Sequence, residues 1–309
     1  DMVPVTDLPG VRNGIFDLNY KSTNIAGRDI SGDLTFRNQM SDDLHDYLEV
    51  EALNDSVDHV LYIIPQDIVR SGKSKWSGFA NWYRVYFRAN RARVLSSNMH
   101  EVGHTLGLKH AGEDGKKYND KSGYMGMTYR KEDEPLMCFN GAHNHQMGWF
   151  AKQELYLSPE DGEWAGNLVT FVDSDKVSEN EVVLITIDDL HLQYNRKKLF
   201  NVGTNKAPDK VTITQSTSST SWFKGALSPG EEFVEYGLVI RFCEAKTNSK
   251  GADIARLSIS PIDGGADFCK GGAPAPKAKG KVQETENDDW YGDESENDDN
   301  DNDDDDDDD

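Results

Sequence analysis

Three histidines and one glutamate stand at the spacing of a catalytic zinc site. Residues 100–110 read His-Glu-Val-Gly-His-Thr-Leu-Gly-Leu-Lys-His. On a helix, His100 and His104 lie one turn apart on the same face, so both imidazoles can bind one ion at about 2.0 to 2.1 Å. Gly107 permits a sharp turn that ends the helix and returns His110 to the same ion. The sequence therefore predicts a Zn²⁺ ion bound by His100, His104 and His110.

Glu101 has the position of a general base. It follows the first histidine on the neighbouring helical face, from which its carboxylate reaches a water at the ion rather than the ion itself. Three protein ligands leave a fourth position open, which distinguishes a catalytic zinc from a structural one. We expect peptide hydrolysis in which the ion lowers the pKa of water to about 7 and Glu101 moves the proton. The alternatives are an amphipathic helix with surface histidines, a structural zinc and an inactive site.

The residues after this motif resemble those of the gametolysin family, the algal and diatom metallopeptidases of family M11. The extended motif with a third histidine is similar to that of the metzincins, whose zinc lies above a methionine-containing turn. The segments that carry the resemblance are Ser122-Gly123-Tyr124-Met125-Gly126-Met127, Cys138-Phe139-Asn140-Gly141-Ala142 and Gln146-Met147-Gly148-Trp149-Phe150. The resemblance covers about residues 58–215.

This resemblance implies a zinc endopeptidase that hydrolyses extracellular or cell-wall (glyco)proteins. It also implies that Met125 is the methionine of the turn, with Met127 as the alternative. Tyr129 stands two residues past Met127, as the switchable tyrosine ligand of astacins does, and is a further candidate.

Hydrophobic patterning indicates an α+β protein. Before the motif we expect a half-buried strand at 15–20, a helix at 40–53, a central strand at 60–64 and a strand at 79–87, where an extended substrate could lie. The motif itself lies on a helix at 93–106. After Trp149, short β-prone runs at 167–172, 182–187, 211–214 and 238–242 indicate a β-sandwich.

We therefore expect three parts. Residues 1–155 form a metzincin-like catalytic domain, a mixed sheet with the active-site helix. Its amino-terminal lobe is short for a metzincin, which suggests truncation. Residues 156–270 form a β-rich, sandwich-like domain, and residues 271–309 form a linker and a disordered acidic tail.

The net charge of −22 is concentrated in that tail. Residues 281–309 carry 17 acidic side chains against one lysine, a net charge of −16. Such a segment cannot bury enough apolar surface to offset the entropy of ordering. The seven aspartates that end at Asp309 either bind calcium or polycations weakly or only solvate the chain.

Nothing in the sequence indicates a membrane or nucleic-acid partner. No run approaches 18 apolar residues, so no membrane span is predicted, and the acidic balance does not favour nucleic acid. No signal peptide opens the chain at Asp1. We expect a secreted protein whose signal peptide is cleaved or lies outside the sequence given.

Three cysteines allow one disulfide within the chain, and three pairings are open. We favour Cys243 with Cys269, because both lie in the carboxy-terminal region, which leaves Cys138 as a thiol.

The remaining histidines offer no second site in the sequence. His143 and His145 lie two residues apart on a predicted helix, so their rings diverge and make a poor chelate. His45, His59 and His191 are isolated, with no visible partner.

A rival function comes from a different class. The chain could be an acidic extracellular binding protein with a vestigial zinc site, in which the tail engages calcium or a polycation. Against it, His100, Glu101, His104, Gly107 and His110 are all present.

Overall fold

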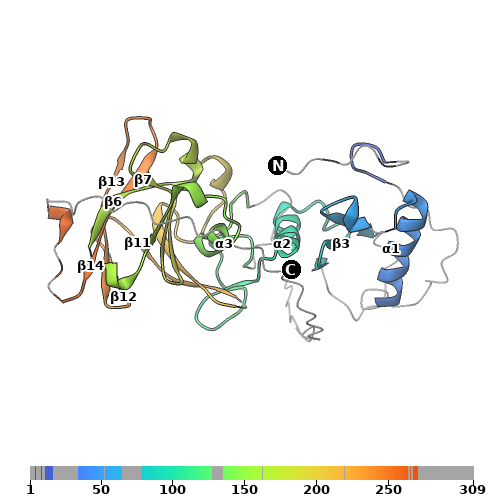
Figure 1. Ribbon diagram of the computed structural model, residues 1–309, viewed down its shortest axis with the longest axis horizontal. Coiled ribbons are helices and arrows are strands. Elements are labelled where there is room, and N and C mark those ends of the chain that lie inside the picture. Colours follow the sequence, from blue (N-terminus) through green and yellow to red (C-terminus); the bar gives the residue numbers. More distant parts are fainter. Residues whose placement is uncertain are drawn as a thin grey trace, which may run out of the picture.

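Helices are few and strands many in this protein, and the prediction of an α+β fold is confirmed. The computed structural model describes residues 4, 8, 11–16, 34–51, 53–64, 78–126, 135–161, 163–218, 220–263, 265 and 267–270. Figure 1 shows an elongated molecule with a β-rich part at one end, α1 at the other, and α2 and α3 between them. The predictions for Met127, Tyr129, the acidic tail and most of the strand at 15–20 lie outside the described residues.

A three-stranded sheet packs between two helices. Its strand order is β1-β3-β2, with β3 parallel to β1 and antiparallel to β2. Helix α1 covers one face through a cluster that includes Leu44, Tyr62 and Tyr86, and α2 lies against β2 and β3 on the other. The bounds are α1 Leu34–Leu48, the 3-10 turn η1 Leu53–Asp55, β1 Val60–Ile64, β2 Gly78–Asn81, β3 Arg84–Arg88 and α2 Leu95–Thr105.

The prediction of a central strand at 60–64 is wrong. β1 is an outer strand of this sheet in the described part of the chain. Leu61 is 43% exposed and Ile63 is 61% exposed, because α2 covers this face only over β2 and β3. A continuous apolar run therefore does not require burial on both faces.

The single strand predicted at 79–87 is a hairpin. The chain turns at Trp82 and Tyr83 between β2 and β3, and Trp82 has a φ of 54°. Aromatic and β-branched residues continue through this turn without a glycine or proline, so the sequence pattern carries no sign of it. Likewise, the helix predicted at 40–53 begins earlier, at Leu34, and ends at Leu48.

Two sheets share one core in the β-rich part of the molecule. The six-stranded sheet has the order β4-β11-β10-β9-β8-β5 and the five-stranded sheet β12-β13-β14-β6-β7. Their common core includes Leu168 from β6, Ile185 from β8 and Leu257 from β14, each fully buried. The β-rich region predicted from short apolar runs is present.

The bounds of these elements follow the chain. The strands are β4 Ala111–Gly112, β5 Glu154–Leu157, β6 Trp164–Val169, β7 Glu181–Val182, β8 Leu184–Ile187, β9 Leu190–Asn195, β10 Lys210–Ser216, β11 Ser221–Leu227, β12 Glu232–Glu235, β13 Leu238–Thr247 and β14 Asp253–Pro261. The helices are α3 Gly141–Gln146 and the 3-10 turns η3 Ala151–Gln153, η4 Pro159–Asp161, η5 Phe171–Lys176, η6 Leu199–Asn201 and η7 Phe268–Lys270.

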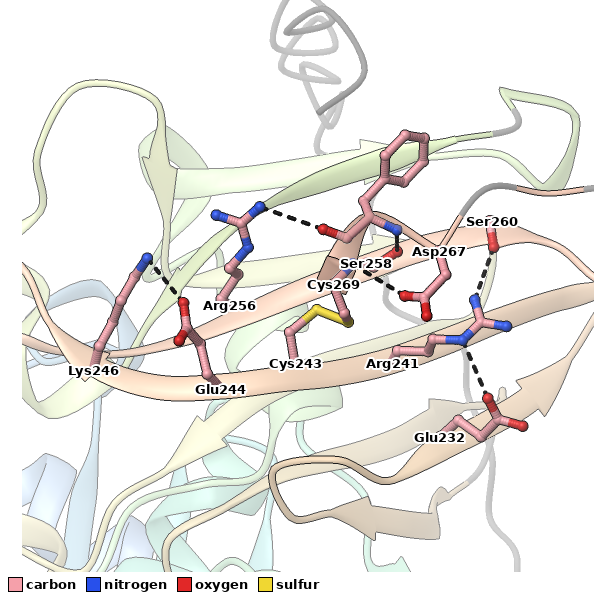
Figure 2. Close-up of a disulfide and its surroundings, with 11 residues drawn as sticks. Glu232, Arg241, Cys243, Glu244, Lys246, Arg256, Ser258, Ser260, Asp267 and Cys269 are labelled. Carbon is pink, nitrogen blue, oxygen red and sulfur yellow. Dashed lines mark hydrogen bonds and ion pairs between the residues drawn. A yellow bond between two sulfur atoms is a disulfide. The ribbon is translucent and has the colours of Figure 1, made fainter. Parts of the chain in front are cut away.

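A disulfide ties the end of the described chain to the five-stranded sheet (Figure 2). It joins Cys243 on β13 to Cys269 on η7, with 5.1 Å between the Cα atoms, and Cys138 is free. The Ser258 hydroxyl accepts a hydrogen bond from the backbone N–H of Phe268 beside it. The structure thus forms the pairing that the sequence favoured. By loop-closure entropy, such a bond stabilises the fold by about 3.5 kcal/mol.

The two ends of the molecule meet in the chain around β4. Strand β4 directly follows residue 110, yet it pairs in parallel with β11 of the six-stranded sheet. The division predicted after residue 155 falls inside β5, a strand of the same sheet. No helix in the described part of the chain is long and apolar enough to cross a bilayer.

Candidate metal centre

Helix α2 presents His100 and His104 from successive turns, and its end returns the chain toward them. The N–H of Gly107 donates to the carbonyl of His104, and the N–H of Leu108 donates to that of Gly103. This is a Schellman motif, which needs a left-handed residue, and Gly107 has a φ of 82°. The turn expected at Gly107 is therefore present, and it carries the chain to His110.

The structure brings the three predicted histidines together. One nitrogen of each of His100, His104 and His110 lies within 4.8 Å of the other two. The Nε2 atoms of His100 and His104 are 3.2 Å apart. Two ligands of a tetrahedral zinc, each at about 2.05 Å, are separated by about 3.3 Å.

Backbone carbonyls determine which ring nitrogens carry protons. His100 Nδ1 lies 2.8 Å from the carbonyl oxygen of Tyr124, and His104 Nδ1 lies 2.8 Å from that of Leu108. A carbonyl only accepts, so both Nδ1 atoms donate and both Nε2 atoms present lone pairs. Such outer hydrogen bonds orient imidazoles that bind a metal.

The environment keeps these imidazoles uncharged. Burial, together with the neighbouring His104, lowers the pKa of His100 to about 3 and the pKa of His110 to about 2. Burial also lowers the pKa of His104. Metal ions bind the neutral imidazole, so the site does not have to lose protons at neutral pH before an ion enters.

Glu101 lies beside this cluster but does not belong to it. Its side chain is 8% exposed and lies against β2, where a Cβ atom on Gly78 would come within 3.2 Å of its Cγ. Burial raises the pKa of Glu101 to about 8, and a nearby cation would lower it. Its carboxylate is not among the grouped ligand atoms.

Met125 forms the floor beneath α2. It is fully buried, and a Cβ atom on Gly103 would lie 2.4 Å from the Met125 sulfur, so only glycine fits at Gly103 without displacing it. The N–H of Ala111 donates to the Met125 carbonyl at 2.8 Å. The segment around Met125 is thereby tied to the residue that follows the third histidine.

Comparison with known proteins identifies the family. Residues 25–197, more than half of the chain, match the model of the gametolysin peptidase M11 family. This chain belongs to that family. An autolysin from Chlamydomonas reinhardtii is 31% identical over 99 residues, which amount to 29% of this chain and 14% of the autolysin. No solved structure matches the chain. Membership of the gametolysin family indicates a metallopeptidase, which acts on a protein substrate and uses a metal.

Tyr118 lies at the centre of this gametolysin-family chain, although the sequence gave no sign of it. Its ring centroid is 4.1 Å from that of His110 and 6.4 Å from that of His100. Its φ of 76° is rare for a bulky residue, and strain of this kind concentrates at functional sites. No spacing rule relates this tyrosine to the histidine motif.

A second group of ligand-type side chains lies in the β-rich part. His145 from α3, Glu154 from β5 and His191 from β9 place one such atom each within 4.8 Å of the others. The expectation that His191 has no partner is wrong, because β8 and β9 bring it beside Thr186, 2.9 Å from Nδ1. His45 also has a partner, since its Nε2 accepts the N–H of Leu53.

His143 and His145 diverge as the helix period requires. His143 is buried, and its imidazole bonds the backbone of Lys109 beside the first cluster. His145 instead contacts Glu154 at 2.7 Å. The two rings serve different neighbours and do not chelate one ion.

Proposed function

We propose that this chain is a secreted, zinc-dependent endopeptidase of the metzincin type, which hydrolyses peptide bonds of extracellular or cell-wall glycoproteins. The observation that carries the proposal is the 3.2 Å approach of His100 Nε2 and His104 Nε2. Both atoms present lone pairs, because both Nδ1 protons are used by carbonyls. Two facing lone pairs repel, so this arrangement favours a cation between them.

The residues present fit a zinc ion. Three neutral imidazoles match the nitrogen ligands of a catalytic zinc, which keeps its fourth position for water or substrate. When bound, zinc supplies a polarised carbonyl and a water of pKa about 7. His100, His104 and His110 hold the ion, and the carbonyls of Tyr124 and Leu108 hold two of the rings.

Glu101 is the proton carrier of the proposed reaction. Its carboxylate accepts the proton of the attacking water and then passes it to the amine that leaves. Placement outside the three-imidazole cluster leaves this carboxylate free for proton transfer. No serine or cysteine nucleophile is needed.

The neighbouring strand suits an extended substrate. In the part of the chain that the structure describes, β2 is the outer strand of the three-stranded sheet. An extended peptide can pair with the backbone of such a strand. Because Gly78 at the start of β2 contacts Glu101, a peptide laid there passes the general base.

Two further features support the metzincin and secretion parts of the proposal. Met125 lies beneath α2, as the methionine of a metzincin turn does, so we propose that role for it. The Cys243–Cys269 disulfide suits an oxidising compartment outside the cytosol. Weak calcium or polycation binding by the acidic tail stays a prediction.

The test compares two buried glutamates, each changed to its isosteric amide. We expect Glu101→Gln to keep its zinc but to lose about 10²- to 10⁴-fold in kcat on a peptide substrate. Glu154→Gln is the matched control, since Glu154 is 4% exposed and lies in the second group. It should keep its turnover number. Full activity in zinc-loaded Glu101→Gln would contradict the assignment of Glu101.

A further inference from the structure

The third histidine is held by the β-rich part of the molecule rather than by α2. The N–H of Ser221 on β11 donates to the backbone carbonyl of His110 at 3.0 Å. Ala111 and Gly112 of β4 then pair with Ser221 and Trp222. A residue 111 positions further along the chain therefore determines where the backbone of His110 lies.

The floor of the centre is fastened to the same strand. The carbonyl of Met125 accepts from Ala111, and the N–H of Asp120 donates to the Ala111 carbonyl. Gly123 lies directly against the backbone of Asn140, since a Cβ atom on it would be 2.6 Å from the Asn140 nitrogen. The segment from His110 to Met125 is thus enclosed between β11 and Asn140.

One buried side chain joins these pieces. Asn140 is 2% exposed, and its Nδ2 donates to Asp120 Oδ2 and to Ser221 Oγ, both at 2.9 Å. Its Oδ1 accepts the N–H of His143 at 3.0 Å and caps α3. Asp120 is fully buried, and its other oxygen accepts the N–H of Ser122.

We infer that Asn140 is a positioning residue for the metal centre, which acts through Ser221 on His110 and through Asp120 on the segment that contains Met125. The inference rests on the proposed function, because the group being positioned is the third ligand of the proposed zinc. Asn140 touches neither the ion nor substrate. Its effect is on how well three imidazoles fit one ion, and outer partners of this kind typically change metal affinity by about 10- to 100-fold.

Asn144 provides a matched control on the same helix. It is fully buried, and its Nδ2 donates two hydrogen bonds, to the carbonyl of Phe139 and to Gln193 Oε1. It bonds neither Asp120 nor Ser221. Loss of either amide should lower the melting temperature by a similar amount, but only the loss of Asn140 should change the metal site.

The experiment measures zinc affinity of the full chain without any peptide substrate. Apo wild type, Asn140→Ala and Asn144→Ala are titrated with zinc against a chromophoric chelator, at a temperature where circular dichroism shows each to be folded. We expect Asn140→Ala to bind zinc about 10- to 100-fold more weakly than wild type and Asn144→Ala to stay within about twofold. The visible spectrum of the cobalt-loaded proteins should change for Asn140→Ala alone.

A milder variant keeps the inference testable if Asn140→Ala does not fold. Ser221→Ala removes the hydroxyl that Asn140 bonds but keeps the backbone N–H that holds His110, and it should weaken zinc binding about 3- to 10-fold. Equal zinc affinity in wild type and in the folded Asn140 or Ser221 variant would overturn the inference alone. Absence of zinc binding in wild type would overturn the proposed function as well.

Discussion

Two groups of three ligand-type side chains lie in this protein, and only one has the geometry of a metal site. In both, the ligand atoms lie within 4.8 Å of one another. In the first, His100 and His104 face each other at 3.2 Å with two nitrogens that carry no proton. In the second, His145 lies 2.7 Å and the Thr186 hydroxyl 2.5 Å from Glu154 Oε1, so each short distance has a proton between its atoms. Proximity alone therefore does not identify a metal site.

The second group is a saturated hydrogen-bond network. Glu154 accepts from His145, Thr186 and Tyr156, while His191 bonds Thr186 and the Ser216 hydroxyl. Ligands of one tetrahedral ion stand about 3.3 Å apart, which is wider than these contacts. The network joins α3 to β5, β8, β9 and β10, and so supports the helix that carries Asn140.

The largest expected effect comes from removing one histidine of the first group. We expect His104→Ala to lose its bound zinc and all measurable peptide hydrolysis, because two imidazoles remain where three are required. Added zinc should raise the melting temperature of wild type but not of this variant. Elemental analysis and differential scanning fluorimetry measure both effects. Stoichiometric zinc in His104→Ala would remove the distinction between the two groups.

The equivalent change in the second group should affect stability and not metal content. His191→Gln loses a well-placed donor and acceptor in a fully satisfied buried network, which costs about 1 to 3 kcal/mol of unfolding free energy. Zinc content and kcat should match wild type. Denaturant unfolding and elemental analysis test the pair, and a lower zinc content here would assign metal binding to the wrong group.

The smallest expected effect is a change in pH dependence. Burial, with His145 and His143 of α3 nearby, lowers the pKa of His191 to about 3, while Glu154 of β5 also faces the ring. Below its ordinary pKa of about 6.5, the unfolded chain binds a proton that the folded chain refuses, so this stability is present above pH 6.5 and lost below it.

This pH effect separates His191 from the other buried histidines. In the metal-free proteins, the stability difference between wild type and His191→Gln should shrink by at most about 2 kcal/mol between pH 7 and pH 5. Contributions from His100, His104, His110 and His143 are common to both proteins and cancel. A difference that is constant with pH would mean that His191 is already charged at neutral pH.

The parts of the site that could be predicted from the sequence are those that helix geometry determines locally. The spacing of His100, Glu101 and His104 follows from 3.6 residues per turn, and Gly107 from the need for a positive φ. The pairing of Cys243 with Cys269 was favoured only by chain position.

What the sequence could not predict depends on pairing across long separations. Ser221 reaches His110 only because β4 joins β11, and His191 reaches Glu154 only because β5, β8 and β9 are neighbours. Asn140 belonged to a segment of family resemblance, but its hydrogen bonds to Asp120 and Ser221 span 20 and 81 residues. No periodic pattern encodes such contacts.

Zinc content measured together with chelator-sensitive hydrolysis of a mixed peptide library tests the central claim most directly. The account predicts one zinc ion per folded chain, hydrolysis that stops when a chelator removes the ion, and recovery when zinc is returned. A folded chain that neither contains zinc nor takes it up, or hydrolysis that a chelator leaves unchanged, would contradict it.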